Sequence, residues 1–161
     1  MIIRIIYTFL LGIFLAIFVG VGISAFYKAP VYPEPPAFVK FSPELSRDAS
    51  KSAEQEIQME QYNQIEKKYR AENQIYARNV SIIAIISATI MVVISLTFIK
   101  NILVIADGIL LGGIFTLVYS VMRGFEAEDN MFHFFVVSAG LLISLILGYV
   151  KFIRPAEKSK K

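Results

Sequence analysis

One acidic residue, Asp107, interrupts an otherwise apolar stretch of the sequence. An ionisable side chain in such a stretch is costly to place in lipid and is often a proton or ion site. A relay would need a second polar group at similar depth, and the sequence offers only hydroxyl groups: Ser95, Thr97 and Ser144. The alternative is structural, because a carboxylate near the N-terminal end of a helix offsets the positive end of its dipole. We expect the structural role.

A second group of ionisable residues surrounds the single histidine of the chain, His133. Three carboxylates precede it closely in the sequence: Glu126, Glu128 and Asp129. Imidazole and carboxylate groups together can bind a cation weakly or form a rim whose charge changes with pH. The simpler interpretation, which we expect, is an ordinary histidine at a membrane interface.

The sequence lacks the side chains on which several kinds of chemistry depend. Its 161 residues include no cysteine and one histidine, which excludes disulfides, thiolate nucleophiles and multi-histidine metal sites within one chain. No phosphate-binding glycine loop, nucleophile elbow or HExxH pattern occurs. We therefore expect no catalytic residue, no cofactor and no metal, and the sequence favours a non-enzymatic protein.

The elements that must position these residues are apolar stretches of membrane-spanning length. Hydrophobic residues make up 56% of the chain, too large a share for a soluble domain of this size. They gather in blocks that each approach the roughly 20 residues needed to cross a bilayer: residues 5–26, 80–99, 102–122 and 131–150. The sequence predicts an all-α membrane protein with four transmembrane helices in a bundle. The first block is too long for a signal peptide and is expected to stay as an anchor.

The second helix is expected to extend outside the bilayer as a long polar arm. Ser42 and Pro43 supply an N-cap hydroxyl and a proline at the first helical position, and residues 44–78 contain neither Pro nor Gly. Prolines in residues 28–41 predict an extended, polyproline-like segment before it. Three aromatic residues of this segment are expected to pack along the arm: Tyr32, Phe38 and Phe41. The alternative is a proline-rich ligand for another protein.

Apolar residues recur along the arm at heptad-like spacing: Tyr62, Ile65, Tyr69 and Tyr76. The intervening position is Glu72, so the stripe is too thin for a coiled coil. We expect the helix to pack against another segment of the same chain and to be partly solvated. The alternative is a partner-binding surface with the tyrosines as anchors.

Small residues recur every four positions in three of the predicted membrane helices. The stripes are Gly12, Ala16, Gly20 and Ser24; Gly108, Gly112, Thr116 and Ser120; and Gly140, Ser144 and Gly148. Small side chains let helices approach closely, and close packing drives helix association in lipid. We predict that these stripes are helix-packing faces, and that Gly124 ends the third membrane helix.

The chain thus divides into eight predicted segments. They are transmembrane helix 1 (1–27), the Pro-rich segment (28–41), the helical arm (42–78), transmembrane helix 2 (79–100), transmembrane helix 3 (101–123), an acidic loop (124–130), transmembrane helix 4 (131–151) and a basic tail (152–161).

An even number of spans places both termini on one side of a cell membrane, and the dense cations near the termini favour the cytoplasm. The basic tail is expected to bind anionic lipid head groups. The predicted partners are the bilayer and a protein or second copy of the chain, not nucleic acid. We expect an assembly, scaffold or accessory subunit that presents its arm. The alternative is a small transporter or channel component in which Asp107 titrates.

Overall fold

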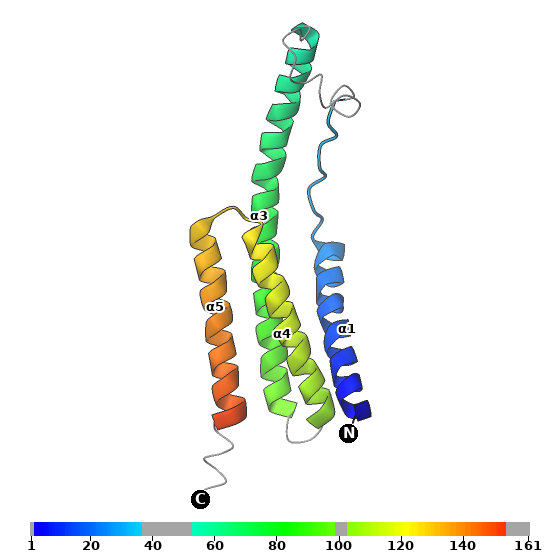
Figure 1. The fold of residues 1–161 in the computed structure, drawn as a ribbon, viewed down its shortest axis with the longest axis vertical. Coiled ribbons are helices and arrows are strands. Elements are labelled where there is room, and N and C mark those ends of the chain that lie inside the picture. Colours follow the sequence, from blue (N-terminus) through cyan, green and yellow to red (C-terminus); the bar gives the residue numbers. More distant parts are fainter. Residues whose placement is uncertain (1, 37–52, 99–102, 154–161) are drawn as a thin grey trace, which may run out of the picture. The chain divides into compact units, whose positions relative to one another are not determined.

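The computed structural model describes residues 2–36, 53–98 and 103–153. Of these residues, 89% are helical and none forms a strand, which confirms the all-helical class. The helices are α1 (Ile2–Phe26), α3 (Ala53–Phe98), α4 (Leu103–Phe125) and α5 (Asn130–Gly148), and α5 continues into the π-helix η2 (Tyr149–Ile153) (Figure 1). By length and composition, four helices of this part of the chain can cross a membrane, as the apolar blocks predicted.

The chain forms two compact units. We call residues 1–28 and 77–161 the apolar unit and residues 29–76 the polar unit. Helix α3 contributes to both, because its composition changes from charged to apolar along its length. Glu, Gln, Lys and Ala lose little conformational freedom in a helix, which explains why the polar half of α3 is helical.

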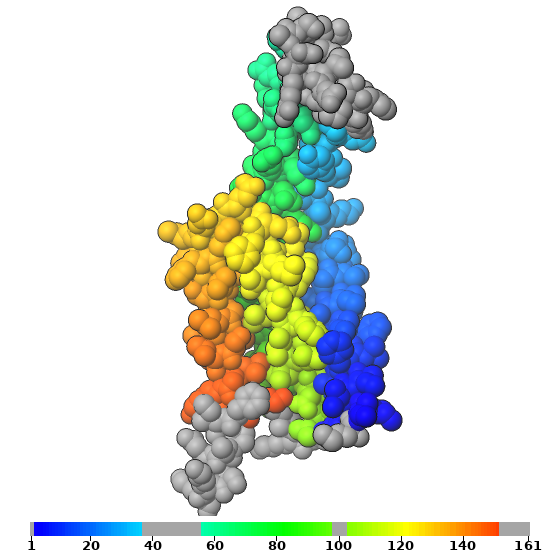
Figure 2. All heavy atoms as spheres, in the orientation of Figure 1, coloured from blue at the N-terminus to red at the C-terminus, as the bar shows by residue number. Residues whose placement is uncertain are grey.

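Helix α4 is the central helix of the apolar unit. Figures 1 and 2 show it between α1 and α5, and its hydroxyl and carbonyl groups also bond to α3. Most of its buried residues are small: Ala106, Gly108, Gly112, Gly113, Thr116, Ser120 and Gly124. Small side chains on several faces let one helix approach three neighbours.

Glycines and leucines interlock where α1 meets α4. A Cβ atom added to Gly112 would lie 2.8 Å from Cβ of Leu15, and one added to Gly12 would lie 3.0 Å from Cβ of Leu111. Gly108 is equally tight, since its Cβ would lie 2.6 Å from a leucine methyl group of α1. These three predicted stripe residues therefore lie at a helix contact.

Other stripe residues lie away from any such contact. No described atom lies within 4 Å of a Cβ added to Gly20 or Gly148. Ser24 and Ser144 are exposed. At these four positions the described part of the chain shows no helix contact, so the packing role stays a prediction there. Residues four apart advance by about 400° around a helix, so a stripe of four drifts by roughly 120° and cannot stay against one neighbour.

The third membrane helix ends one residue later than the predicted Gly124. Helix α4 continues to Phe125, and Gly124 is buried where a Cβ would lie 3.1 Å from Oγ of Ser81 and 3.2 Å from a methyl carbon of Val136. The glycine therefore permits packing. The left-handed backbone of the following turn is carried by Glu128, with φ of 50°.

Several sequence predictions fall on residues that the structure does not describe. These are the helix start at Ser42 and Pro43, the packing of Phe38 and Phe41, the connection at Lys100 and Asn101, and the tail beyond Ile153.

Candidate functional site

Asp107 forms an ion pair with a residue that its sequence context did not suggest. Nζ of Lys151, in η2, lies 2.8 Å from Oδ1 of Asp107, in the second turn of α4. Both side chains are partly buried, with 32% of Asp107 and 25% of Lys151 exposed. The start of α4 and the end of α5 lie at the same end of these two antiparallel helices (Figure 1). The antiparallel order of the two helices could have indicated this pair, since it places an early residue of the third span beside a late residue of the fourth.

The hydroxyl groups considered as relay partners are engaged elsewhere. Oγ of Ser95 donates to the carbonyl of Ala106 at 2.6 Å, and Oγ1 of Thr97 donates within α3. Ser144 is exposed. Among the described contacts, Asp107 therefore meets a cation and none of these three hydroxyls, an arrangement that favours the structural role.

The acidic loop uses its carboxylates to shape the chain. Oδ1 of Asp129 accepts from the backbone N–H groups of Met131 and Phe132 and so caps α5, an arrangement that satisfies two otherwise unpaired donors. Glu126 pairs with Arg123, which precedes it on α4. These contacts account for two of the three acidic residues named with His133.

His133 does not complete a cation site with this loop. Its ring packs on Phe125, with ring centroids 4.9 Å apart, and no hydrogen bond to its buried Nε2 is present in the described part of the chain. No group of three or more histidine, aspartate or glutamate side chains in that part is placed to hold a metal ion. The alternative of a weak cation site is therefore not supported in that part of the chain, where Asp129 caps α5 and Glu126 pairs with Arg123.

A buried pair of serines joins α3 to α4. Oγ of Ser81 donates to the carbonyl of Ser120 at 2.9 Å, and Oγ of Ser120 donates to the carbonyl of Ser81 at 2.8 Å. Ser120 belongs to a predicted stripe, whereas Ser81 was not predicted. The sequence could have indicated Ser81, because small residues recur there every three or four positions: Ala77, Ser81, Ala84 and Ala88. In the structure all four are fully buried.

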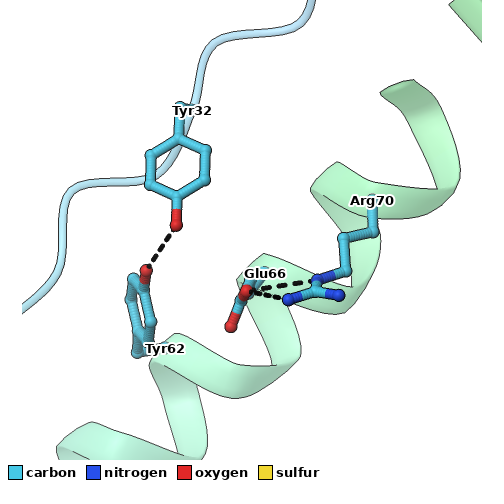
Figure 3. Close-up of polar contacts among 4 residues, drawn as sticks. All are labelled: Tyr32, Tyr62, Glu66 and Arg70. Atoms are coloured by element: carbon cyan, nitrogen blue, oxygen red, sulfur yellow. Dashed lines mark hydrogen bonds and ion pairs between the residues drawn. The ribbon is translucent and has the colours of Figure 1, made fainter. Parts of the chain in front are cut away.

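The polar unit contains a tyrosine clasp, which we define as Tyr32, Tyr62 and Tyr69. Figure 3 shows the hydroxyl groups of Tyr32 and Tyr62 facing each other, 3.3 Å apart. The ring of Tyr32 also meets that of Tyr69 edge to face, with centroids 5.1 Å apart, a favourable arrangement for aromatic pairs. The expected contact of Tyr32 with this helix is thus present. The hydrogen bond with Tyr32, followed by desolvation, raises the pKa of Tyr62 from 10.0 to about 12.

An ion pair within the same helix turn accompanies the clasp. Both Nε and a terminal nitrogen of Arg70 donate to one carboxylate oxygen of Glu66, at 3.1 and 2.7 Å (Figure 3). This is the i,i+4 spacing at which opposite charges stabilise a helix by a few tenths of a kcal/mol.

The tyrosines predicted as partner anchors are largely used within the chain. Tyr62 and Tyr69 meet Tyr32, and Tyr76 is buried. Ile65 is 56% exposed and is the member of the predicted set that remains on the surface. The structure therefore favours packing of this helix against another segment of the same chain. It gives less support to the tyrosines as anchors for a partner.

The polar half of α3 also exposes three isoleucines that the heptad-like spacing did not group. Ile57, Ile65 and Ile75 are each more than half exposed. At about 100° per residue, their directions fall within an arc of roughly 80° around the helix. We call these three residues the isoleucine strip.

No protein-family model, curated protein or solved structure matches this chain. The contacts of its own residues are therefore the basis on which a function can be proposed.

Proposed function

We propose that this chain is a non-enzymatic multi-pass membrane protein that acts as an assembly, scaffold or accessory subunit. In this proposal the membrane helices form a bundle with both termini in the cytoplasm, and the polar half of α3 is an extramembrane arm that binds a protein partner. The isoleucine strip is the observation that carries the proposal.

Large apolar side chains are unusual on a helix surface that is otherwise charged. Ile57, Ile65 and Ile75 are exposed by 57%, 56% and 53%, although the same segment carries many Glu, Gln and Lys residues. Exposed apolar residues that share one side of a helix and are bordered by polar ones can form part of a protein contact surface.

The tyrosine clasp supports the proposal because it orders the surface before a partner binds. Tyr32 contacts both Tyr62 and Tyr69, which lie one heptad apart beside the strip. A helix that is already ordered loses less conformational entropy on binding, so more of the contact energy appears as affinity.

The ion pair bears on the alternative role as a transporter or channel component. Lys151 offsets the charge of Asp107 and gives that carboxylate a structural use. An intramembrane proton or ion site at Asp107 is therefore supported less well than the subunit role.

Photocrosslinking in native membranes tests the proposed surface. Benzoylphenylalanine would replace Ile65 in the full chain, and a matched variant would carry it at Asn63, which is also exposed but points about 160° away on the same helix. We expect a discrete heteromeric adduct from position 65 and little from position 63. Equal adducts at both positions, or none from position 65, would contradict the proposal.

A further inference from the structure

An apolar groove runs between α1 and the apolar half of α3. Its volume is about 530 Å³. Its lining includes Phe18, Gly22, Ile23, Phe26, Ile83 and Ser87. Both walls belong to the apolar unit.

The groove is apolar even where a hydroxyl lines it. Oγ of Ser87 donates to the carbonyl of Ile83 within α3 at 2.9 Å, so this donor is satisfied without a ligand. Gly22 faces the open space of the groove, because no atom outside its own stretch of helix lies within 4 Å of a Cβ added there. Such a groove suits a hydrocarbon chain, which needs van der Waals contact and no hydrogen bonds.

The length of the groove matches one leaflet of a bilayer. Its lining extends along α1 from Phe18 and ends at Tyr27, just after the helix, which corresponds to ~14 Å at about 1.5 Å per residue. Half of a hydrocarbon core of about 30 Å is ~15 Å. One acyl chain therefore fits this length.

One end of the groove is polar and positively charged. Tyr27 lines this end, and its hydroxyl accepts from Nδ2 of Asn79 at 2.9 Å. Lys28 follows Tyr27 directly and is exposed. The apolar run of α3 begins near this end, at Val80. A cation at the edge of an apolar run is suited to a phosphate at the membrane surface.

We propose that the groove between α1 and α3 binds one acyl chain of an anionic phospholipid, whose phosphate is held by Lys28. The apolar lining holds the chain, and the lysine selects for a net negative head group over a zwitterionic one. This site is distinct from the isoleucine strip and does not depend on a protein partner.

Lipid titration followed by native mass spectrometry tests the acyl-chain site. The full chain in detergent would be titrated with phosphatidylglycerol or with phosphatidylcholine of the same acyl chains. Gly22→Leu fills the groove. Gly20→Leu is the matched control, since Gly20 is also in open space but does not line the groove and points about 200° away from Gly22.

We expect Gly22→Leu to weaken phosphatidylglycerol binding by about tenfold, the factor for losing some two buried methylene groups. Gly20→Leu should bind as the unmodified chain does. Equal affinity in the two leucine variants would overturn the site. A change of oligomeric state in Gly22→Leu alone would assign the groove to a protein contact and would also overturn it.

A second variant tests the head-group preference without filling the groove. Lys28→Gln should reduce the preference for phosphatidylglycerol over phosphatidylcholine to about one, while phosphatidylcholine binding stays unchanged. A preference that survives this substitution would overturn the role of Lys28. Circular dichroism of each variant verifies that its helices are intact.

Discussion

Asp107 and Lys151 show how a charge can be retained in an apolar helix. An isolated carboxylate in lipid is costly, and a lysine at the end of a span faces the same cost. Their contact at 2.8 Å offsets both charges. Because each side chain is about a quarter to a third exposed, water screens the pair, and its contribution to stability lies nearer to that of a surface ion pair than to that of a buried one.

Replacing one partner of this pair should destabilise the helix contact. We expect Asp107→Asn or Lys151→Gln to lower the free energy of unfolding by about 1 kcal/mol, and the double substitution to cost less than the sum of the two. The measurement is denaturant titration in mixed micelles, with helicity followed by circular dichroism.

Exchanging the two charges, Asp107→Lys with Lys151→Asp, is the matched control and should restore part of the loss. Fully additive single effects would show that the pair is not coupled. If Asp107 instead served as an ion site, Asp107→Asn would abolish ion-dependent flux in vesicles while leaving stability unchanged.

Among the helices of the apolar unit, α4 depends most on glycine residues for its packing against its neighbours. Gly12 and Gly112 bring α1 and α4 close enough for leucines to fill the space above each glycine. On another side, the reciprocal serine pair joins α4 to α3. Hydrogen bonds between membrane helices contribute about 0.6 kcal/mol each on average, so we expect close packing to contribute more than the serine pair to the association of these helices.

Adding one methyl group at this contact should therefore be costly. In Gly112→Ala the new Cβ would lie 2.8 Å from Cβ of Leu15 and 3.3 Å from the carbonyl oxygen of Gly12, atoms that can move only with the backbone. We expect a loss of about 1 to 3 kcal/mol, measured by the same unfolding titration.

The matched control is Gly20→Ala on α1, where the added Cβ enters open space. This substitution should be neutral or stabilising by up to about 1 kcal/mol, because alanine favours helix over glycine. A similar effect of both substitutions would contradict the packing role of Gly112.

At the scale of the whole molecule, the number of membrane-spanning helices determines which segments share a compartment. If all four apolar helices cross the membrane, the start of α1 and the end of α5 share one side, and the residues that follow α1 and those that precede α5 share the other. Each further prediction about partners depends on this topology, because a protein partner must reach the isoleucine strip from its own compartment.

Single cysteines can be introduced for labelling without removing any native ones, since the chain contains no cysteine. In intact cells a membrane-impermeant maleimide should label Val31→Cys and Asn130→Cys, and should label Ile3→Cys only after permeabilisation. Labelling of just one of the first two would contradict four spans. The reverse pattern would keep the spans and invert the orientation.

The sequence alone determined which segments are helices of membrane-spanning length. Hydrocarbon excludes unpaired backbone groups, so uncharged runs of about 20 residues have few other structures available. It also singled out Asp107, the contact of Tyr32 with the polar helix, and the tightly packed Gly12, Gly108 and Gly112. These follow from composition and from spacing along one helix.

Only the tertiary structure decided which faces of the helices meet. Positions four apart drift around a helix, so spacing did not show that Gly12 packs on α4 whereas Ser24 is exposed. Nor did it pair Asp107 with Lys151, which is 44 residues away. Contacts between helices depend on crossing angles and rotations that arise from all the side chains at once, and no single stretch of sequence contains that information.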